Sequence, residues 1–344
     1  MIKNKGFLGW FFEPLVEIIE YHKNQSIEIK QELPDLHPAL HKYQSFRPTN
    51  FEEYIGQERA KTILRSYITA MKERNQTMPH ILISGEAGFG KTTLAKIIAN
   101  ELKINFKDII TSTLENSGDI LNCIHEIDGG VLFLDETHSL SRSMAESIYS
   151  IMEDFRYNGI EIKPFTLIGA TTELGELLQD RKPFVDRFKI IIELEDYTLA
   201  NLSQMSRQFR LTVFPYDNIN FKIHELLAEN CRQTPRTVIR LTEALVYLGN
   251  LTTVLKSFGI IKNGYTNKDL QVLRYLNLNE KGIGLQGLTS YLGTSATNYT
   301  HQIEPYLLKN ELLIRTARGR KLTEKGKIKI KELEDLLISQ STLF

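Results

Sequence analysis

The sequence predicts an α/β fold with a parallel sheet, followed by an all-helical region and a C-terminal winged helix. Three observations support this prediction. Short apolar runs alternate with longer helical segments over residues 46–195, the pattern of strands buried on both faces of a parallel sheet. Apolar residues recur at helical spacing over residues 196–265, and residues 266–344 contain short helices and a basic segment. Residues 1–45 precede these three domains as an extension.

The strands and helices of the first two domains are expected where apolar residues concentrate. Continuous apolar runs predict strands at Ile81–Ile83, Val131–Leu134 and Phe165–Ile168. The segments between them supply crossover helices, such as Leu94–Leu102. Helical spacing continues around Ile223 and over Val238–Leu248.

The last domain has the element pattern of a winged helix. A first helix is expected at Asp269–Leu276 and a second at Leu285–Leu292. The apolar stripe of a third helix consists of Tyr299, Ile303, Tyr306 and Leu307. Residues 316–320 then form the tip of the wing. Eight Lys or Arg and one acid, Glu324, lie between Ile314 and Glu332. This concentration predicts a surface that contacts nucleic-acid phosphates with little sequence preference, although a solvated basic helix would look the same.

Composition excludes several classes of protein. The 344 residues are 42% apolar and 24% charged, which is ordinary for a globular chain and excludes disordered and disulfide-scaffold classes. Lys plus Arg and Asp plus Glu both number 42, so a wholly basic nucleic-acid coat is excluded but a local basic patch is not. Two distant cysteines, Cys123 and Cys231, predict a reducing cytoplasmic location. Cys123 and His125 offer too few ligands for a zinc site.

The N-terminal extension contains an amphipathic helix in our interpretation, at Phe11–Tyr21. No apolar run is long enough to span a membrane, and no cleavage site of a signal peptide follows the apolar residues. The helix either docks on its own protein or anchors the chain to a partner or a membrane surface.

The strongest functional motif is the run from Gly85 to Thr92, which matches G-x-x-x-x-G-K-[ST] between a strand and a helix. Gly85, Gly88 and Gly90 let the backbone curl so that its N–H groups face phosphates. Lys91 adds a cation, the hydroxyl of Thr92 can bind Mg²⁺, and the helix N-terminus adds partial positive charge. The motif predicts nucleotide binding.

Two further strand ends complete this predicted site. The strand Val131–Leu134 leads into Asp135, which would hold the metal mostly through water, and Glu136, which would act as general base. Strand termination is the simpler but less favoured interpretation of the two acids. The third strand ends in Thr171 and Thr172. One of these could contact the γ-phosphate or the attacking water, and a strand-end cap is an equal alternative.

Several motifs together resemble one family of AAA+ ATPases, the RuvB family, over about residues 46–326. The matching segments, in chain order, are Arg47-Pro48, Tyr54–Gln57, Asp135–His138, Met152–Phe155, Pro164–Thr172, Asp186–Phe188, Thr234–Arg236, Glu304–Leu307 and Arg315–Arg320. The resemblance implies an AAA+ large domain with a parallel sheet, an all-helical lid and a winged helix. It also implies a motor that uses ATP and Mg²⁺ to drive branch migration of Holliday junctions in recombination and repair.

The resemblance assigns roles to single positions. The expected nucleotide contacts are Phe46, Arg47, Tyr54, Ile55, Gly88, Lys91, Thr92, Thr93, Glu153, Asp154, Phe155, Thr171, Tyr197 and Arg236. Arg187 matches an arginine finger that reaches the γ-phosphate of a neighbouring subunit, so that a ring, expected to be a hexamer, is required. Arg315, Arg318 and Arg320 are the expected DNA contacts.

Simpler interpretations exist for some of these residues. Arg187 could pair with Asp186 or Glu193. Arg236 stands at a helix start, where a cation gains nothing from the helix dipole, which favours a nearby phosphate. His138 is interpreted as a strand-end histidine without a catalytic role.

The sequence also departs from the family. Only eight residues, Arg156 to Lys163, stand where the family has a longer β-hairpin that grips RuvA, which argues against a conventional RuvA partnership. Val185 replaces an additional arginine near the finger, and Ala296 replaces a basic DNA-contact residue.

Three functions remain open on sequence grounds. The first is an ATP-driven DNA translocase or helicase of the RuvB type. The alternative is a nucleotide-dependent switch or clamp-loader-like remodeler that binds DNA without processive translocation. A DNA-binding adaptor with a degenerate ATPase is disfavoured by the intact Gly-Lys-Thr and Asp-Glu motifs.

Overall fold

A computed structural model describes residues 46–114, 116–157, 159–215 and 219–341. The predictions made for residues 1–45 lie outside the described residues. No helix in the described part of the chain is long and apolar enough to cross a membrane. The described residues also hold no cluster of three or more His, Cys, Asp or Glu side chains that could bind a metal ion.

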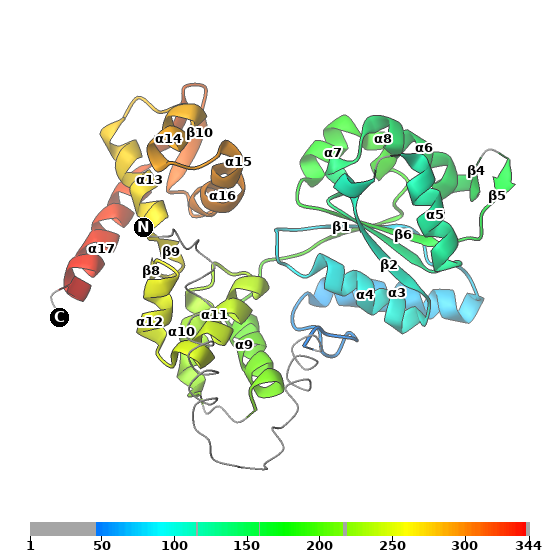
Figure 1. Cartoon of the computed structure of the whole chain (residues 1–344), viewed down its shortest axis with the longest axis horizontal. Helices are drawn as coiled ribbons and strands as arrows, with labels where there is room; N and C mark the ends of the chain where they lie inside the picture. The colour runs from blue at the N-terminus through cyan, green and yellow to red at the C-terminus, as the bar shows by residue number, and fades with distance from the viewer. Residues whose placement is uncertain (1–45, 115, 158, 216–218, 342–344) are drawn as a thin grey trace, which may run out of the picture. The chain divides into compact units, whose positions relative to one another are not determined.

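The first domain is built on a five-stranded parallel sheet (Figure 1). Its strands, in the spatial order β2-β3-β6-β1-β7, are Phe106–Ile110, Val131–Asp135, Thr166–Thr171, Ile81–Ser84 and Ile190–Glu193. The three strands predicted from apolar runs are confirmed as β1, β3 and β6, which form the fully buried centre of the sheet. All of them point their carboxyl ends to one edge, where ligands of such sheets bind.

Helices cover both faces of this sheet (Figure 1). One face carries α3 (Glu58–Arg74) and α4 (Lys91–Leu102). The other carries α5, α6, α7 and α8, which are Ser117–Ile127, Arg142–Asp154, Leu174–Asp180 and Lys182–Val185. Two apolar clusters result, one on each face. The sheet is therefore packed on both faces beneath its strand ends.

In the described part of the chain, four helices follow the sheet domain, and they include the predicted segments around Ile223 and over Val238–Leu248. They are α9 (Leu199–Val213), α10 (Phe221–Glu229), α11 (Pro235–Leu248) and α12 (Leu251–Ser257). The expectation of helix alone over 196–265 is wrong at its end, where β8 (Ile260–Lys262) pairs with β9 (Tyr265–Thr266). Ile261 and Tyr265 are buried in the apolar cluster of the C-terminal domain, because two short strands can lean on a neighbouring core that they could not form alone.

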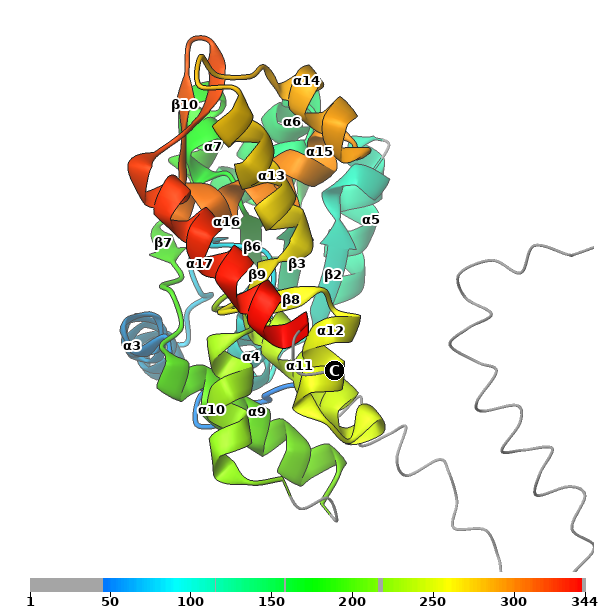
Figure 2. The same cartoon turned by 90° about the vertical axis from the view of Figure 1, so that its left-hand side faces the viewer.

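The C-terminal domain is a winged helix. Its first two helices are α13 (Asn267–Leu278) and α14 (Leu285–Leu292). A third helical stretch joins α15 (Ala296–Asn298), the π-turn η3 (Tyr299–Ile303) and α16 (Glu304–Lys309). The wing is the hairpin of β10 (Leu313–Thr316) and β11 (Gly319–Leu322). The last helix, α17 (Glu324–Ser341), lies beside α13 (Figure 2), and an ion pair of 2.7 Å joins Arg274 to Glu334.

Buried His80, just before β1, should make folding sensitive to acid. The N–H of Leu167 donates to its Nδ1 at 2.9 Å, so Nε2 carries the ring proton and donates to the carbonyl of Met152 at 3.0 Å. Burial lowers the pKa of His80 below its usual 6.5. The unfolded chain therefore binds the proton more tightly, and this contribution to stability is present above pH 6.5 and lost as the pH falls below it.

The measurable consequence is the pH dependence of urea unfolding between pH 7.5 and pH 5.5. His80→Asn, which keeps an acceptor for Leu167 but cannot titrate, should remove a slope of up to about 1.4 kcal/mol per pH unit. His125→Asn on the exposed face of α5 is the matched control and should leave the slope unchanged. An identical slope in the wild type and His80→Asn would contradict the assignment.

Candidate functional site

The loop from Gly85 to Lys91 joins the carboxyl end of β1 to α4 and forms the cradle that the motif predicts. Gly88 and Gly90 have φ angles of 85° and 95°, which other residues rarely adopt. A Cβ at Gly90 would lie 2.9 Å from the hydroxyl of Tyr54, and one at Gly88 would lie 3.1 Å from Cβ of Arg236. Glycine is therefore required at both positions by backbone conformation and by close packing.

Lys91 lies buried at the start of α4, where its ammonium group faces the loop. Its Nζ donates to the carbonyls of Gly85 at 2.8 Å and Glu86 at 3.4 Å. Burial lowers the pKa of Lys91, while the carboxylates of Glu136 and Asp135 oppose this effect. The Lys91 ammonium is thus a cation that donates to uncharged backbone carbonyls of the loop, and the oxygens of an anionic ligand could replace those carbonyls.

Tyr54 and Tyr197 support the same loop from below. The Tyr197 hydroxyl donates to the carbonyl of Phe89 at 2.9 Å, and its ring meets that of Phe89 edge-on at 5.6 Å. The Tyr54 hydroxyl lies 3.4 Å from the carbonyls of Phe89 and Gly90. Burial raises the pKa of both tyrosines. In this structure, both predicted nucleotide contacts hold the backbone of the loop through their hydroxyl groups.

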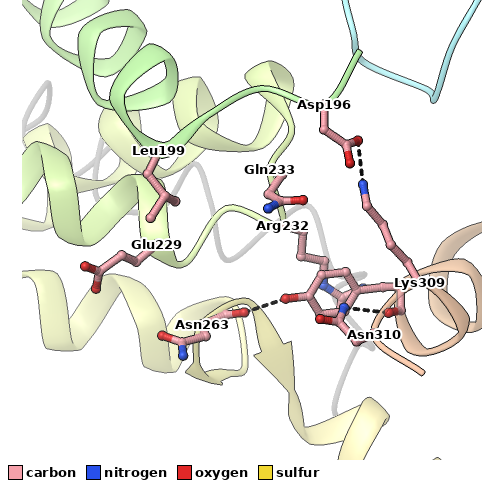
Figure 3. A pocket seen from close by; sticks show the side chains of 9 residues that line it. Asp196, Leu199, Glu229, Arg232, Gln233, Asn263, Lys309 and Asn310 are labelled. Carbon is pink, nitrogen blue, oxygen red and sulfur yellow. Dashed lines mark hydrogen bonds and ion pairs between the residues drawn. The ribbon is translucent and has the colours of Figure 1, made fainter. Parts of the chain in front are cut away.

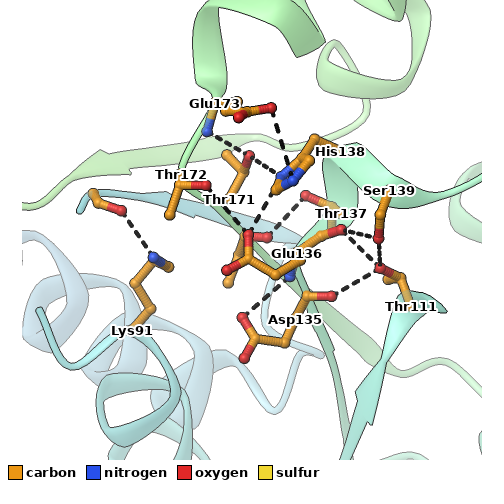
Figure 4. A network of polar contacts seen from close by, with 12 residues as sticks. Lys91, Thr111, Asp135, Glu136, Thr137, His138, Ser139, Thr171, Thr172 and Glu173 are labelled. Atoms are coloured by element: carbon orange, nitrogen blue, oxygen red, sulfur yellow. Dashed lines mark hydrogen bonds and ion pairs between the residues drawn. The ribbon is translucent and has the colours of Figure 1, made fainter. Parts of the chain in front are cut away.

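The predicted pair of acids lies opposite Lys91, at the end of β3 (Figure 4). The Asp135 carboxylate accepts the N–H of Glu136 at 3.1 Å. Glu136 has a φ of 54°, a strained conformation for a residue with a side chain. The hydroxyl of Thr111, on the short helix η1 (Thr111–Thr113), donates to the carbonyl of Glu136 at 2.7 Å and holds this turn. Sequence reasoning missed Thr111, which has no motif of its own.

The two threonines at the end of β6 have different neighbours. The Thr171 hydroxyl is buried and accepts the N–H of Glu173 at 2.9 Å, as a strand-end cap does. It also lies 3.2 Å from Nδ1 of His138. Thr172, by contrast, donates to Oε2 of Glu136 at 3.4 Å. Of the pair, Thr172 has the contact with a predicted catalytic group.

The remaining predicted nucleotide contacts surround the loop in part. Arg236, at the start of α11, is exposed and packs against Gly88. Phe46 packs edge-on against Phe209 of α9 at 4.8 Å, Ile55 packs against the core of the sheet, and Arg47 is exposed. Thr92 and Thr93 begin α4 directly after Lys91.

Glu153, Asp154 and Phe155 are not brought to the phosphate loop of the same chain. Phe155 packs against His80, with ring centres 6.0 Å apart, at the amino end of β1. The loop begins at the opposite end of that strand, about 16 Å away at 3.3 Å per residue. A strand therefore separates these residues from the chain's own loop.

Arg187 lies at this same far edge, after α8. Its Nη1 donates to the carbonyl of Pro183 at 2.8 Å, and its Nη2 lies 3.3 Å from Oε1 of Glu153. The guanidinium sits 5.1 Å above the ring of Tyr149, and its buried Nε has no hydrogen-bond partner among the described residues. The ion pair is with Glu153, not with Asp186 or Glu193 as the simpler interpretation expected. With a side chain 24% exposed, Arg187 remains accessible at the surface.

The departures from the family pattern have a clear structural setting. Arg156–Tyr157 and Ile160–Glu161 pair as β4 and β5, a hairpin of two-residue strands. Val185, the last residue of α8, is buried in the apolar cluster on this face of the sheet. A packed apolar side chain therefore stands where the family has the additional arginine.

In the wing, the three predicted DNA-contact arginines have different surroundings. Arg318 is exposed at the turn. Arg315 donates to Oε2 of Glu304 at 2.7 Å, and Arg320 donates to both oxygens of Glu304 at 2.7 and 3.2 Å. Glu304 is fully buried and the Arg320 side chain is only 15% exposed. Burial alone would raise the pKa of Glu304, but the hydrogen bonds from both arginines lower it.

Replacement of the wing arginines by alanine should therefore separate folding from DNA binding. Arg320→Ala leaves a buried carboxylate with one exposed partner, and should lower the unfolding free energy by about 3 kcal/mol. Arg318→Ala should leave stability within about 0.5 kcal/mol and reduce the salt dependence of DNA binding by about one ion. Urea unfolding and fluorescence anisotropy with labelled duplex at several salt concentrations measure these effects. Equal stability of the two variants would contradict the structural role of Arg320.

A polar cavity of about 690 Å³ lies beside the helical region (Figure 3). Lys309 of α16 borders it and reaches Asp196 at 2.6 Å and Glu86 of the phosphate loop at 3.5 Å. The hydroxyl of Tyr306 donates to the carbonyl of Asn263 at 2.6 Å. The other residues that line the cavity are Leu199, Glu229, Arg232, Gln233 and Asn310.

Comparisons with known proteins agree with this arrangement. The P-loop domain of the Holliday junction DNA helicase RuvB matches residues 46–194, and the RuvB C-terminal winged helix domain matches residues 262–331. The RuvB subunit of the Holliday junction branch migration complex from Kosmotoga olearia is 35% identical over 309 residues, covering 82% of this chain and 89% of that protein. The Campylobacter lari subunit is 36% identical over 301 residues, covering 80% and 88%.

Solved structures give the same result. The RuvB Holliday junction branch migration motor of Thermotoga maritima superposes with a TM-score of 0.73 at 36% identity, covering 83% of this chain and 98% of that one. The similarity therefore includes the sheet domain, the helical region and the winged helix together. On this similarity of sequence and structure, the chain belongs to the RuvB family of P-loop ATPases.

Proposed function

We propose that the chain is an ATP-driven motor that moves the branch point of Holliday junctions. The observation that supports this proposal is that the predicted catalytic residues lie at two opposite edges of the sheet. Lys91, Asp135 and Glu136 gather at the carboxyl edge of the sheet, and Arg187 lies at the amino edge. A finger on the far edge cannot serve the same chain's loop, so hydrolysis should require a neighbour.

The loop and the acids suit ATP with Mg²⁺. Gly88 and Gly90 leave no side chain in the cradle, and the Lys91 ammonium donates to the loop carbonyls of Gly85 and Glu86, which phosphate oxygens can replace. Thr92 and Asp135 would hold the Mg²⁺, since a hydroxyl and a carboxylate are oxygen ligands that this ion prefers. When bound, the ion would neutralise phosphate charge. Glu136 would accept the proton of the attacking water.

Assembly and DNA contacts complete the proposal. Arg187 would leave Glu153 to reach the neighbour's γ-phosphate, and Arg236 would sense the phosphate from the helical lid (196–265) of its own chain. A hexameric ring in the cytoplasm would satisfy each site in turn. Arg315, Arg318 and Arg320 would meet the phosphate backbone of duplex DNA, with Arg320 also holding the wing. The short β4–β5 hairpin argues for a loading partner other than a conventional RuvA.

The test is branch migration of a synthetic four-way junction in ATP and Mg²⁺, with and without RuvA, alongside size measurement with and without ATP. We expect strand separation that depends on ATP, a ring-sized species, and no activity in Lys91→Ala. ATP hydrolysis without any separation of the junction would favour the nucleotide-dependent switch and would contradict the motor.

A further inference from the structure

His138, which we interpreted from sequence as a strand-end histidine, contacts the predicted general base. It lies on the short helix η2 (Thr137–Ser139), directly after β3. Its Nδ1 is 3.3 Å from Oε2 of Glu136 (Figure 4). Because a carboxylate only accepts hydrogen bonds, the imidazole can restrain Oε2 from this position when Nδ1 carries a proton.

The surroundings fix the position of the imidazole. The neighbouring Thr137 is buried and donates to the carbonyl of Ala170 at 3.0 Å, which ties η2 to β6. Nδ1 of His138 also lies 3.2 Å from the Thr171 hydroxyl, and Nε2 lies 3.8 Å from Oε2 of Glu173. With only 22% of its side chain exposed, the histidine is a fixed bridge between the ends of β3 and β6.

The two oxygens of the Glu136 carboxylate have different environments. Oε2 receives the Thr172 hydroxyl at 3.4 Å and faces Nδ1 of His138 at 3.3 Å. Oε1 has no hydrogen bond to any residue that the structure describes, and the side chain is 39% exposed. One oxygen is therefore anchored while the other is available to a ligand.

We propose that His138 is a positioning residue, which holds Oε2 of Glu136 so that Oε1 stays available to accept the proton of the attacking water. The proposal rests on the general-base role of Glu136 given above. Without the imidazole, Thr172 alone would restrain a carboxylate on a strained turn, and the catalytic orientation would be less populated.

Three substitutions at this position test the geometry. The amide nitrogen of asparagine is as far from Cβ as Nδ1 of histidine, whereas that of glutamine is one bond further, where Nε2 lies. We expect His138→Ala and His138→Gln to lower kcat about 10-fold with little change in KM for ATP, and His138→Asn to retain most of the activity. His125→Ala on α5 is the control for loss of a histidine and should be unaffected.

The measurements are steady-state ATPase assays at saturating junction DNA, with binding of a fluorescent ATP analogue and thermal unfolding on the same preparations. A structural role alone would change stability or nucleotide binding without favouring asparagine over glutamine. An unchanged or increased kcat in His138→Ala, or asparagine no better than glutamine, would overturn the proposal. Because glutamine and asparagine variants are compared with each other, poor folding of the alanine variant leaves the test intact.

Glu136→Gln, measured in the same series, separates this proposal from the one on which it rests. If Glu136→Gln is inactive while His138→Ala has wild-type turnover, only the positioning role fails. If Glu136→Gln itself hydrolyses ATP at the wild-type rate, the general-base assignment fails and the role of His138 fails with it.

Discussion

Arg187→Ala is expected to lower ATP turnover by about 10³–10⁵-fold, the range for loss of an arginine finger. The reason is that a guanidinium neutralises charge that develops on the γ-phosphoryl group during transfer. In the described structure Arg187 instead pairs with Glu153 and stacks on Tyr149 at the far edge of the sheet. Turnover per subunit, measured at saturating ATP, reports the loss directly.

The same residue permits a test of whether the finger acts between subunits. Lys91→Ala subunits have a defective loop but an intact finger, and Arg187→Ala subunits have the reverse. Each alone should be inactive, whereas mixed rings contain interfaces that join an intact loop to an intact finger. Turnover should therefore reappear on mixing, in proportion to such interfaces.

Two controls make the mixing experiment decisive. Lys182→Ala, an exposed cation on α8 near Arg187, tests for non-specific effects of removing charge at this edge and should keep full turnover. Crosslinking or native mass spectrometry should confirm that mixed rings form. If mixed rings form and remain inactive, Arg187 does not act in trans, and the ring mechanism is wrong.

The ion pair between Glu153 and Arg187 competes with the proposed action of the finger in the neighbouring subunit. Because Glu153 holds Arg187 in the isolated chain, Glu153→Gln should weaken the resting contact without removing the finger. In the described structure Glu153 occupies the guanidinium that the neighbour's phosphate would take, so the glutamate would have to leave Arg187 before the finger could act. Sequence could not reveal this pair, since it depends on how α6 and α8 pack.

Local signals were sufficient to predict the centre of the fold. The helix Leu285–Leu292 has the predicted bounds because glycines flank it, Gly284 before it and Gly293 at its C-cap with a φ of 61°. The central strands are apolar on both faces, and the phosphate loop combines glycine, lysine and threonine at fixed spacing. Each of these features is determined by neighbouring residues in the chain.

Features that residue periodicity does not report escaped prediction. The edge strand Phe106–Ile110 contains Lys107 and Asp108 and is half-exposed, so it has no continuous apolar run. The π-turn Tyr299–Ile303 precedes Pro305, which lacks the N–H that a regular helix would use there. These deviations follow from position in the sheet and from backbone chemistry, which residue periodicity does not report.

The candidate site follows the same division. Lys91, Asp135 and Glu136 could be picked out from the sequence because each belongs to a motif that follows a predicted strand. His138 was not, because its partners include Thr171, which is 33 residues away on another strand. Contacts between residues on two different strands depend on the register of β3 and β6, and only a structure supplies that register.

Glu136→Gln is expected to lower kcat by about 10²–10⁴-fold, the typical contribution of a general base. The substitution keeps the size of the side chain and its ability to accept from Thr172 and to meet His138, but it removes the oxygen that can take a proton at neutral pH. ATP should still bind, because Lys91 and the loop glycines are unchanged. The variant should therefore accumulate with ATP bound, and its rings should be more stable in ATP than those of the wild type.

Rapid-quench measurement of a single turnover, with ATP binding measured separately, distinguishes the chemical step from binding. Glu146→Gln, the same change at an exposed position on α6 that pairs with Arg142, should behave as the wild type. Equal single-turnover rates in the wild type and Glu136→Gln would mean that another group takes the proton. Among the described residues, Asp135 is the only other carboxylate at this strand end, so that result would assign the proton to Asp135 and leave Glu136, despite its strained backbone, without the role of general base.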